Sequence, residues 1–207
     1  QNTKSDKISF IQRETKIISS SLDTAYDLNS YSFGYNSSNI TSDEIKKILS
    51  SFNIADPWRK MTLLSSTIGL TSFPLDNSFK NAAARRHTAA HNTASTIPIQ
   101  DLHQYIQEAI AIALTFDALI SIAKIKLIRE NSNFISKKIT IDNNSINLSF
   151  VKYENNKWKY KRKGKIKAIK TDIDKTTLLS SVRPIAQSNN ECLIIYDESN
   201  NILDWQT

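Results

Sequence analysis

In residues 1–131, apolar side chains recur every three to four positions, which is the spacing of one face of an α-helix. Polar segments rich in Ser and Asn, such as residues 32–39, separate these stretches and are typical of loops. Start signals agree with this pattern, because Thr41 and Glu44 have the spacing of a capping box and Pro57 suits the first turn of a helix. The pattern predicts five helices, at residues 5–31, 41–52, 57–69, 76–91 and 99–128.

The last of these helices is apolar around most of its circumference. Its polar residues form only a narrow stripe, and a helix that is apolar on several faces is buried on several faces. Two interpretations stay open: the helix forms the middle of one core, or it serves a core and a dimer interface together. Gln107, Glu108 and Asp117 interrupt the apolar run, so a membrane span is not expected.

From about residue 131 the pattern changes to alternation, which is typical of β-strands. Asn-Asn pairs at 143–144, 155–156 and 200–201 separate the runs and suit tight hairpins, because Asn tolerates positive φ. The sequence therefore predicts an α+β protein, with an N-terminal all-α bundle at 1–131 and a small, mostly antiparallel β module with one helix at 132–207. The predicted strands cover residues 138–141, 146–153, 157–163, 166–171, 192–196 and 202–205, and the helix covers 174–186.

The composition is that of a globular protein, with 40% hydrophobic and 23% charged residues. A net charge of +7 and a pI near 9.4 favour an anionic partner, nucleic acid first, although a basic balance can also serve solubility alone. A single cysteine, Cys192, excludes an internal disulfide, and we expect it to be a buried small hydrophobe in a cytoplasmic protein. The chain begins with Gln1, so we expect a processed product or a piece of a longer protein.

The alanine-rich stretch at residues 81–92 holds a polar set with catalytic potential. Successive helical residues turn by about 100°, so Arg86, His87 and His91 fall within an arc of roughly 140°. Arginine can hold a phosphate bidentately, and histidine can take or give a proton near neutral pH. Arg85 points elsewhere, where a surface salt bridge is the preferred interpretation and a substrate contact the alternative. For the whole set, the alternative is a helix end whose dipole attracts cations.

The pattern Arg86-x-x-x-x-His91, with a polar His87 directly after the arginine and a long apolar helix next, resembles the HEPN superfamily of small helical ribonuclease and toxin domains. The likeness covers roughly residues 5–131 and is greatest to HEPN proteins of mobile and defence loci. It implies a metal-independent endoribonuclease in which the RNA 2′-hydroxyl attacks the adjacent phosphorus, leaving a 2′,3′-cyclic phosphate. It also implies that Arg86 holds the phosphate, that His91 transfers protons, and that His87 and Asn92 orient the phosphate or the second histidine.

By the same resemblance, the expected partners are RNA, a second copy of the chain, and an antitoxin or companion defence protein, with no membrane involved. Some HEPN domains only dimerise or bind, so the alternative is a non-catalytic nucleic-acid-binding or dimerisation module of a larger protein. No cofactor or metal is expected. His87 and His91 have the i, i+4 spacing of metal ligands, but no Glu stands between them and no third ligand is obvious.

Residues 152–170 carry nine Lys or Arg and one acid, Glu154, which gives a local charge of +8. Alternation along the predicted strand puts its lysines on one face, with Trp158 and Tyr160 on the other. Two interpretations are equally supported: a surface that tracks nucleic-acid phosphates, or a solvated sheet face whose lysines prevent edge aggregation. The candidate contact residues are Lys157, Lys159, Lys161, Lys163, Lys165 and Lys167.

Overall fold

A computed structural model describes residues 9, 40–71, 73–91 and 98–207 of the chain. By their internal contacts the residues separate into two units, Gln1–Ile48 and Leu49–Thr207. Apart from Ser9, the predicted helix at 5–31 lies outside the described residues. This division does not test the predicted domain boundary at residue 131, which stays a prediction.

The helices α2 (Ser42–Ser51) and α3 (Pro57–Ile68) form where the sequence predicts them. At the start of α2 the capping box is present: the Glu44 N–H donates to Thr41 Oγ1 at 3.2 Å, and the Thr41 N–H donates to Glu44 Oε2 at 2.7 Å. The helix α3 ends at Gly69, whose φ of 86° lies in the left-handed region that glycine adopts without strain. Local capping chemistry therefore sets these boundaries.

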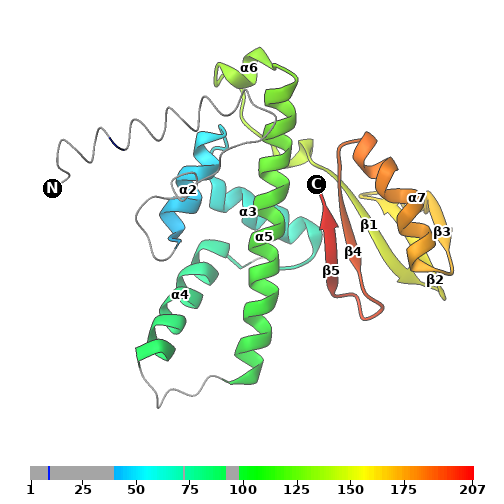
Figure 1. The fold of residues 1–207 in the computed structure, drawn as a ribbon, viewed down its shortest axis with the longest axis horizontal. Coiled ribbons are helices and arrows are strands. Elements are labelled where there is room, and N and C mark those ends of the chain that lie inside the picture. The colour runs from blue at the N-terminus through cyan, green and yellow to red at the C-terminus, as the bar shows by residue number, and fades with distance from the viewer. Residues whose placement is uncertain (1–8, 10–39, 72, 92–97) are drawn as a thin grey trace. The chain divides into compact units, whose positions relative to one another are not determined.

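Two further helices, α4 (Leu75–His91) and α5 (Ile99–Ile128), run in opposite directions beside each other (Figure 1). The bounds of α5 are the predicted ones. The helix α4 begins one residue before the predicted caps, because the carbonyl of Pro74 already accepts a helical hydrogen bond from the Ser78 N–H at 3.2 Å. The described residues include no helix with the length and apolarity that crossing a membrane requires.

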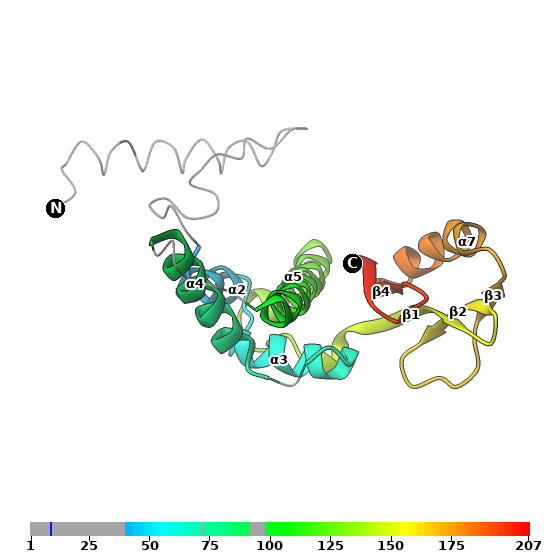
Figure 2. The same ribbon diagram turned by 90° about the horizontal axis from the view of Figure 1, so that it is seen from below.

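The middle of α5 is the centre of a core, which both interpretations of its apolar pattern include. It contacts α3 and α4 on one side and lies against β5 (Ile202–Gln206) on the other (Figures 1 and 2). On the β5 side, the indole N–H of Trp205 donates to Asp117 Oδ2 at 2.9 Å. The side chains of Leu114 and Leu119 are fully buried. Tertiary packing thus accounts for the apolar character of the middle of α5.

The segment between α5 and the sheet differs from the prediction. The strand predicted at 138–141 is absent, and so is the hairpin at 143–144. Short helices α6 (Ser132–Ile135) and η1 (Asn143–Ser145) flank this segment instead. Side chains satisfy its backbone: the amide of Asn53 donates to the carbonyl of Ile139 at 2.8 Å, and Lys60 Nζ donates to that of Ile141. A strand partner is therefore not needed here.

The rest of the chain forms a five-stranded sheet in the order β3-β2-β1-β4-β5. Three of its four strand pairs are antiparallel and the central pair, β1 with β4, is parallel, which confirms the predicted mostly antiparallel module. One helix, α7, covers one face of the sheet (Figure 2). Besides β5, the elements are β1 (Asn147–Glu154), β2 (Lys157–Arg162), β3 (Lys170–Asp172), α7 (Lys175–Ser188) and β4 (Glu191–Tyr196).

Asparagines make the turns at two predicted hairpins. Asn155 and Asn156 have φ of 55° and 59°, as the two central positions of a type I′ turn between β1 and β2 require. Asn200, with φ of 64°, lies in the β4–β5 connection. The strand predicted at 166–171 is reduced to the three residues of β3. Beneath α7, Trp158 and Tyr160 pack into the core of the module, as their alternation with lysines predicts.

Candidate functional site

The predicted Arg/His set lies on the exposed second half of α4. Residues 83–91 are all exposed, and the buried residues of this helix, Leu75 and Ser78, belong to its first turns. The rings of His87 and His91 lie next to each other, with centroids 4.5 Å apart and planes inclined by 57°. The structure therefore brings both histidines together in solvent, and Arg86 is exposed on the same stretch. Asn92 lies outside the described residues.

Arg85 is held against α5. Its Nη1 lies 3.2 Å from Asp101 Oδ2, and its guanidinium stacks 4.8 Å from the centroid of the Tyr105 ring. This confirms the surface salt bridge that we preferred for Arg85, while a substrate contact by the same residue stays a prediction. The cation–π contact and the ion pair fix the end of α4 against the start of α5.

The first turns of α5, which adjoin this end of α4, leave large apolar side chains in solvent. Ile99, Leu102 and Ile106 are 66%, 52% and 49% exposed. Single exposed apolar residues are ordinary, but three on successive turns of one helix form a small patch. The patch extends the apolar surface of α5 beyond the part that packs within the chain.

Two of the lysines of β2 are engaged in ion pairs within the sheet. Lys159 and Lys161 lie on the face opposite Trp158, and both form ion pairs with Glu154 on the neighbouring strand, at 3.5 and 2.5 Å. The hydrogen bond from Lys161 is the main cause that lowers the pKa of Glu154 below its usual 4.5, against an opposing effect of burial. The only acid in the basic run thus neutralises part of it, because the hairpin folds β1 back onto β2.

The strand β2 ends at Arg162, so Lys163 is not on the strand face where we predicted it. The candidate contact residues Lys165 and Lys167 lie in the connection between β2 and β3. The Lys165 N–H donates to the Arg162 carbonyl at 3.1 Å, and Gly164 has a φ of 75°. This hydrogen bond and the positive φ at the third position are those of a type II turn. The turn changes the direction of the chain and separates these lysines from those of β2.

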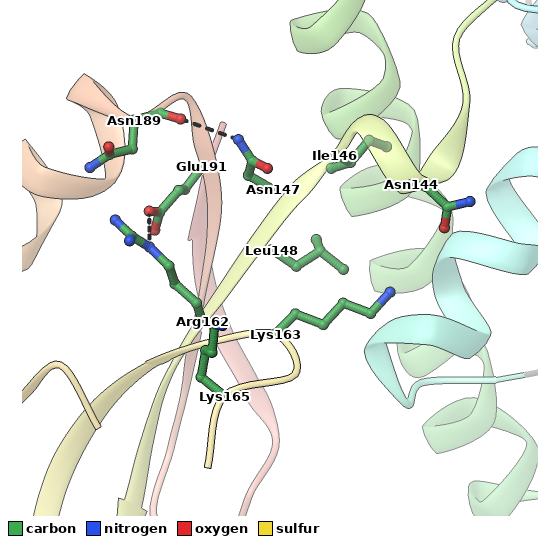
Figure 3. A pocket seen from close by; sticks show the side chains of 9 residues that line it. All are labelled: Asn144, Ile146, Asn147, Leu148, Arg162, Lys163, Lys165, Asn189 and Glu191. Atoms are coloured by element: carbon green, nitrogen blue, oxygen red, sulfur yellow. Dashed lines mark hydrogen bonds and ion pairs between the residues drawn. The ribbon is translucent and has the colours of Figure 1, made fainter. Parts of the chain in front are cut away.

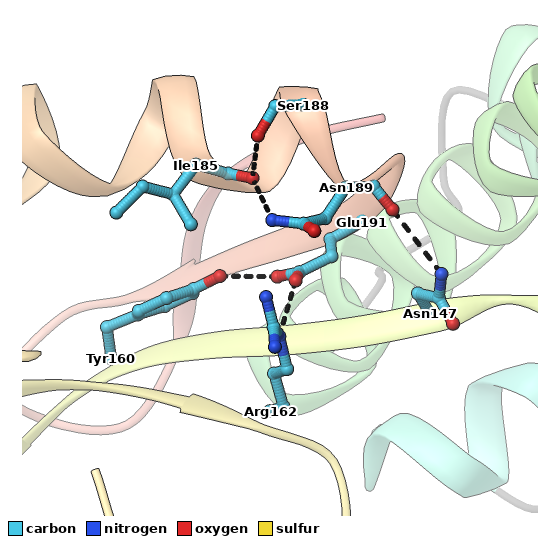
Figure 4. Close-up of polar contacts among 7 residues, drawn as sticks. All are labelled: Asn147, Tyr160, Arg162, Ile185, Ser188, Asn189 and Glu191. Carbon is cyan, nitrogen blue, oxygen red and sulfur yellow. Dashed lines mark hydrogen bonds and ion pairs between the residues drawn. The ribbon is translucent and has the colours of Figure 1, made fainter. Parts of the chain in front are cut away.

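A buried carboxylate, which the sequence analysis did not single out, organises the same end of β2. Glu191 on β4 is 3% exposed; its Oε1 accepts from Arg162 Nε at 2.5 Å, and its Oε2 accepts from the Tyr160 hydroxyl (Figure 4). Burial and, next, the hydrogen bond to Glu191 raise the pKa of Tyr160 to about 12, so this hydroxyl remains a donor at neutral pH. Contact with Glu191 also raises the pKa of Arg162, whose charge is permanent. An acid at the start of the apolar run 192–196 was the available signal for this network.

Beside this network lies a cavity of about 400 Å³. Figure 3 shows the cations Arg162, Lys163 and Lys165 near one another, with Glu191 paired to Arg162 and Asn147 near Glu191. The three cations and one carboxylate give its lining a net charge of +2. The other lining residues are neutral: Asn144, Ile146, Leu148 and Asn189.

Within the described ranges, no three side chains of His, Cys, Asp or Glu gather in a way that could hold a metal ion. Comparisons of the chain with protein-family models, with curated proteins and with solved structures found no match.

Proposed function

We propose that the chain is a HEPN-type endoribonuclease that cleaves RNA at the Arg86/His87/His91 set without a metal ion. The observation that carries the proposal is the adjacency of His87 and His91 on an exposed helical surface that contributes nothing to the core. Attraction of cations to the helix dipole is the competing explanation, and it acts within the last turn. It accounts for His91, but Arg86 lies five positions before the end of α4, beyond that turn.

The proposed reaction is a transfer within the RNA strand. The 2′-oxygen forms a bond to the adjacent phosphorus and gives its proton to His91, while the bond to the 5′-oxygen breaks. In a symmetric dimer, His91 of the second copy gives a proton to the leaving 5′-oxygen. Arg86 holds the phosphate oxygens while negative charge builds on them, and His87 orients the phosphate or the neighbouring His91.

Dimerisation is supported by the apolar patch on the first turns of α5. Ile99, Leu102 and Ile106 are exposed, and α5 adjoins the end of α4 that carries the Arg/His set. A second copy that covers this patch buries apolar surface and brings two Arg/His sets to one cleft. An antitoxin or companion defence protein in the cytoplasm belongs to the same proposal, since an active ribonuclease needs control.

The test is cleavage of single-stranded RNA by the purified chain in the presence of a chelator. We expect products that end in a 2′,3′-cyclic phosphate, and we expect His91→Ala to lower the rate by at least about 100-fold, the usual contribution of a general acid or base. His103→Ala is the matched control, because His103 is an exposed histidine on α5 outside the set. Equal cleavage by His91→Ala and the wild-type protein would contradict the assignment.

A second candidate function has its own support in the basic cavity on the sheet. Its cations favour a non-catalytic module that binds nucleic acid. A chain that cleaves no RNA at any pH, but loses RNA binding when these cations are replaced, would favour this second function. Binding measured at two salt concentrations separates phosphate contacts from other contributions, since phosphate contacts weaken steeply with salt.

A further inference from the structure

The cavity beside Glu191 has the features of a small-molecule site, and its lining comes only from residues 144–191. We propose that it binds a nucleotide, with the phosphate group held by Arg162, Lys163 and Lys165. None of the Arg/His residues of α4 lines this cavity. The proposal is therefore independent of RNA cleavage and stands whether or not His91 is catalytic.

The phosphate assignment follows from how Glu191 holds Arg162. The carboxylate engages Nε, which leaves the two terminal nitrogens of the guanidinium with hydrogens to donate. Glu191 is itself held by the Tyr160 hydroxyl and is almost fully buried, so the position of Arg162 is set before any ligand arrives. The Arg162 side chain is 43% exposed, which leaves the guanidinium accessible. A preorganised guanidinium is suited to a tetrahedral oxyanion.

Two lysines give the lining its net positive charge, because Glu191 balances the charge of Arg162. Lys163 and Lys165 line the cavity on the turn at Gly164, and in the described part of the chain neither forms a salt bridge. The lining therefore keeps its net positive charge, unlike the face of β2, where Glu154 pairs with two lysines. The flexible stems of these lysines allow them to close on a bound phosphate.

The remaining walls fit the neutral part of a nucleotide. Asn147 lines the cavity, and its side-chain amide donates to the Asn189 backbone carbonyl at 3.4 Å, which fixes the orientation of the amide group (Figures 3 and 4). Asn144 also lines the cavity with its amide, which donates to Asp142 Oδ2 at 3.3 Å, and Leu148 and Ile146 supply apolar surface. A volume of about 400 Å³ lies within the range of small-ligand pockets. Amide and apolar side chains are the groups that contact the base and the sugar of a nucleotide.

The experiment is a titration of the ¹⁵N-labelled full chain followed by NMR, with AMP, inorganic phosphate, adenosine and a 5′-phosphorylated RNA trinucleotide as probes. We expect AMP and phosphate to shift the Arg162 Nε–H signal and the amides around the cavity, and adenosine to leave them unchanged. If the trinucleotide binds more tightly than AMP, the phosphate arrives as part of a strand; if AMP binds more tightly, the ligand is the free nucleotide.

A matched pair of double variants distinguishes a specific nucleotide site from a generally basic surface that attracts any anion. Lys163→Ala with Lys165→Ala should weaken AMP binding at least about tenfold, because two charge-assisted contacts are lost. Lys138→Ala with Lys170→Ala removes the same charge from exposed positions of the same module outside the cavity, and it should change AMP binding less than about twofold. Equal losses in the two variants, or no shift of the cavity signals with phosphate and AMP, would overturn the proposal.

Discussion

Replacing Arg162 by methionine tests how strongly the buried carboxylate depends on its ion pair. The change leaves Glu191, with a side chain 2% exposed, buried with the Tyr160 hydroxyl as its one side-chain donor among the described residues. Breaking a fully buried pair costs about 3–5 kcal/mol, and breaking an exposed pair costs less than about 1 kcal/mol. One partner here is buried and the other is 43% exposed, so we expect the free energy of unfolding to fall by about 2 kcal/mol.

The measurement is a double-mutant cycle with Glu191→Gln, using urea unfolding followed by tryptophan fluorescence. Trp158 is 5% exposed in the core of the module and reports on its unfolding. In the Glu191→Gln background the buried carboxylate of this pair is gone, so Arg162→Met should cost less than about 0.5 kcal/mol, which gives a coupling of about 1.5 kcal/mol. A coupling below about 0.3 kcal/mol would refute the reasoning, since Glu191 would then not be holding Arg162 in place.

Three further predictions concern single side chains. Lys161 lowers the pKa of Glu154 in the folded state, so the contribution of Glu154 to stability is lost as the pH falls below about 4.5. The melting temperature of Glu154→Gln should therefore fall less than that of the wild-type protein between neutral and acidic pH. The pKa of Tyr160 is raised to about 12 in the folded state, so the unfolded state releases the hydroxyl proton at lower pH and stability is lost above about pH 10. Tyr160→Phe should therefore lose less stability than the wild-type protein between about pH 9 and pH 11. Arg85→Gln removes the ion pair with Asp101, and we expect a loss below about 1 kcal/mol in urea unfolding with RNA cleavage retained.

Long local patterns predicted the helical part well. The bounds of α5 follow from thirty residues of one pattern, and the start of α3 follows from Pro57. The strand predicted at 138–141 failed because Asn53 and Lys60, about eighty positions earlier, satisfy the backbone there, and no local pattern encodes that. The strand predicted at 166–171 failed in part because its isoleucines are not buried: Ile166 is 97% exposed and Ile169 is 44% exposed.

The sequence pattern could not predict the parallel pairing of β1 with β4 for a similar reason. Two strands and α7 separate these strands along the chain, and alternation shows which face of a strand is buried but not which strand lies beside it. The buried Glu191 escaped notice on the same grounds, because its partners Tyr160 and Arg162 come from another strand. The histidine pair was accessible to prediction because both residues lie on one helix at i, i+4 spacing.

The ion pairs of the sheet change where its positive charge is available. Lys159 and Lys161 share Glu154, so for these two residues the interpretation as a solvated sheet face is favoured. Beyond Arg162 the chain leaves the strand, and Lys163 and Lys165 line a cavity with a net positive charge. The two interpretations of the basic run therefore apply to different parts of it. If the proposed ribonuclease uses this module to hold RNA, we expect the contact to come from the turn that follows β2 and not from the face of β2.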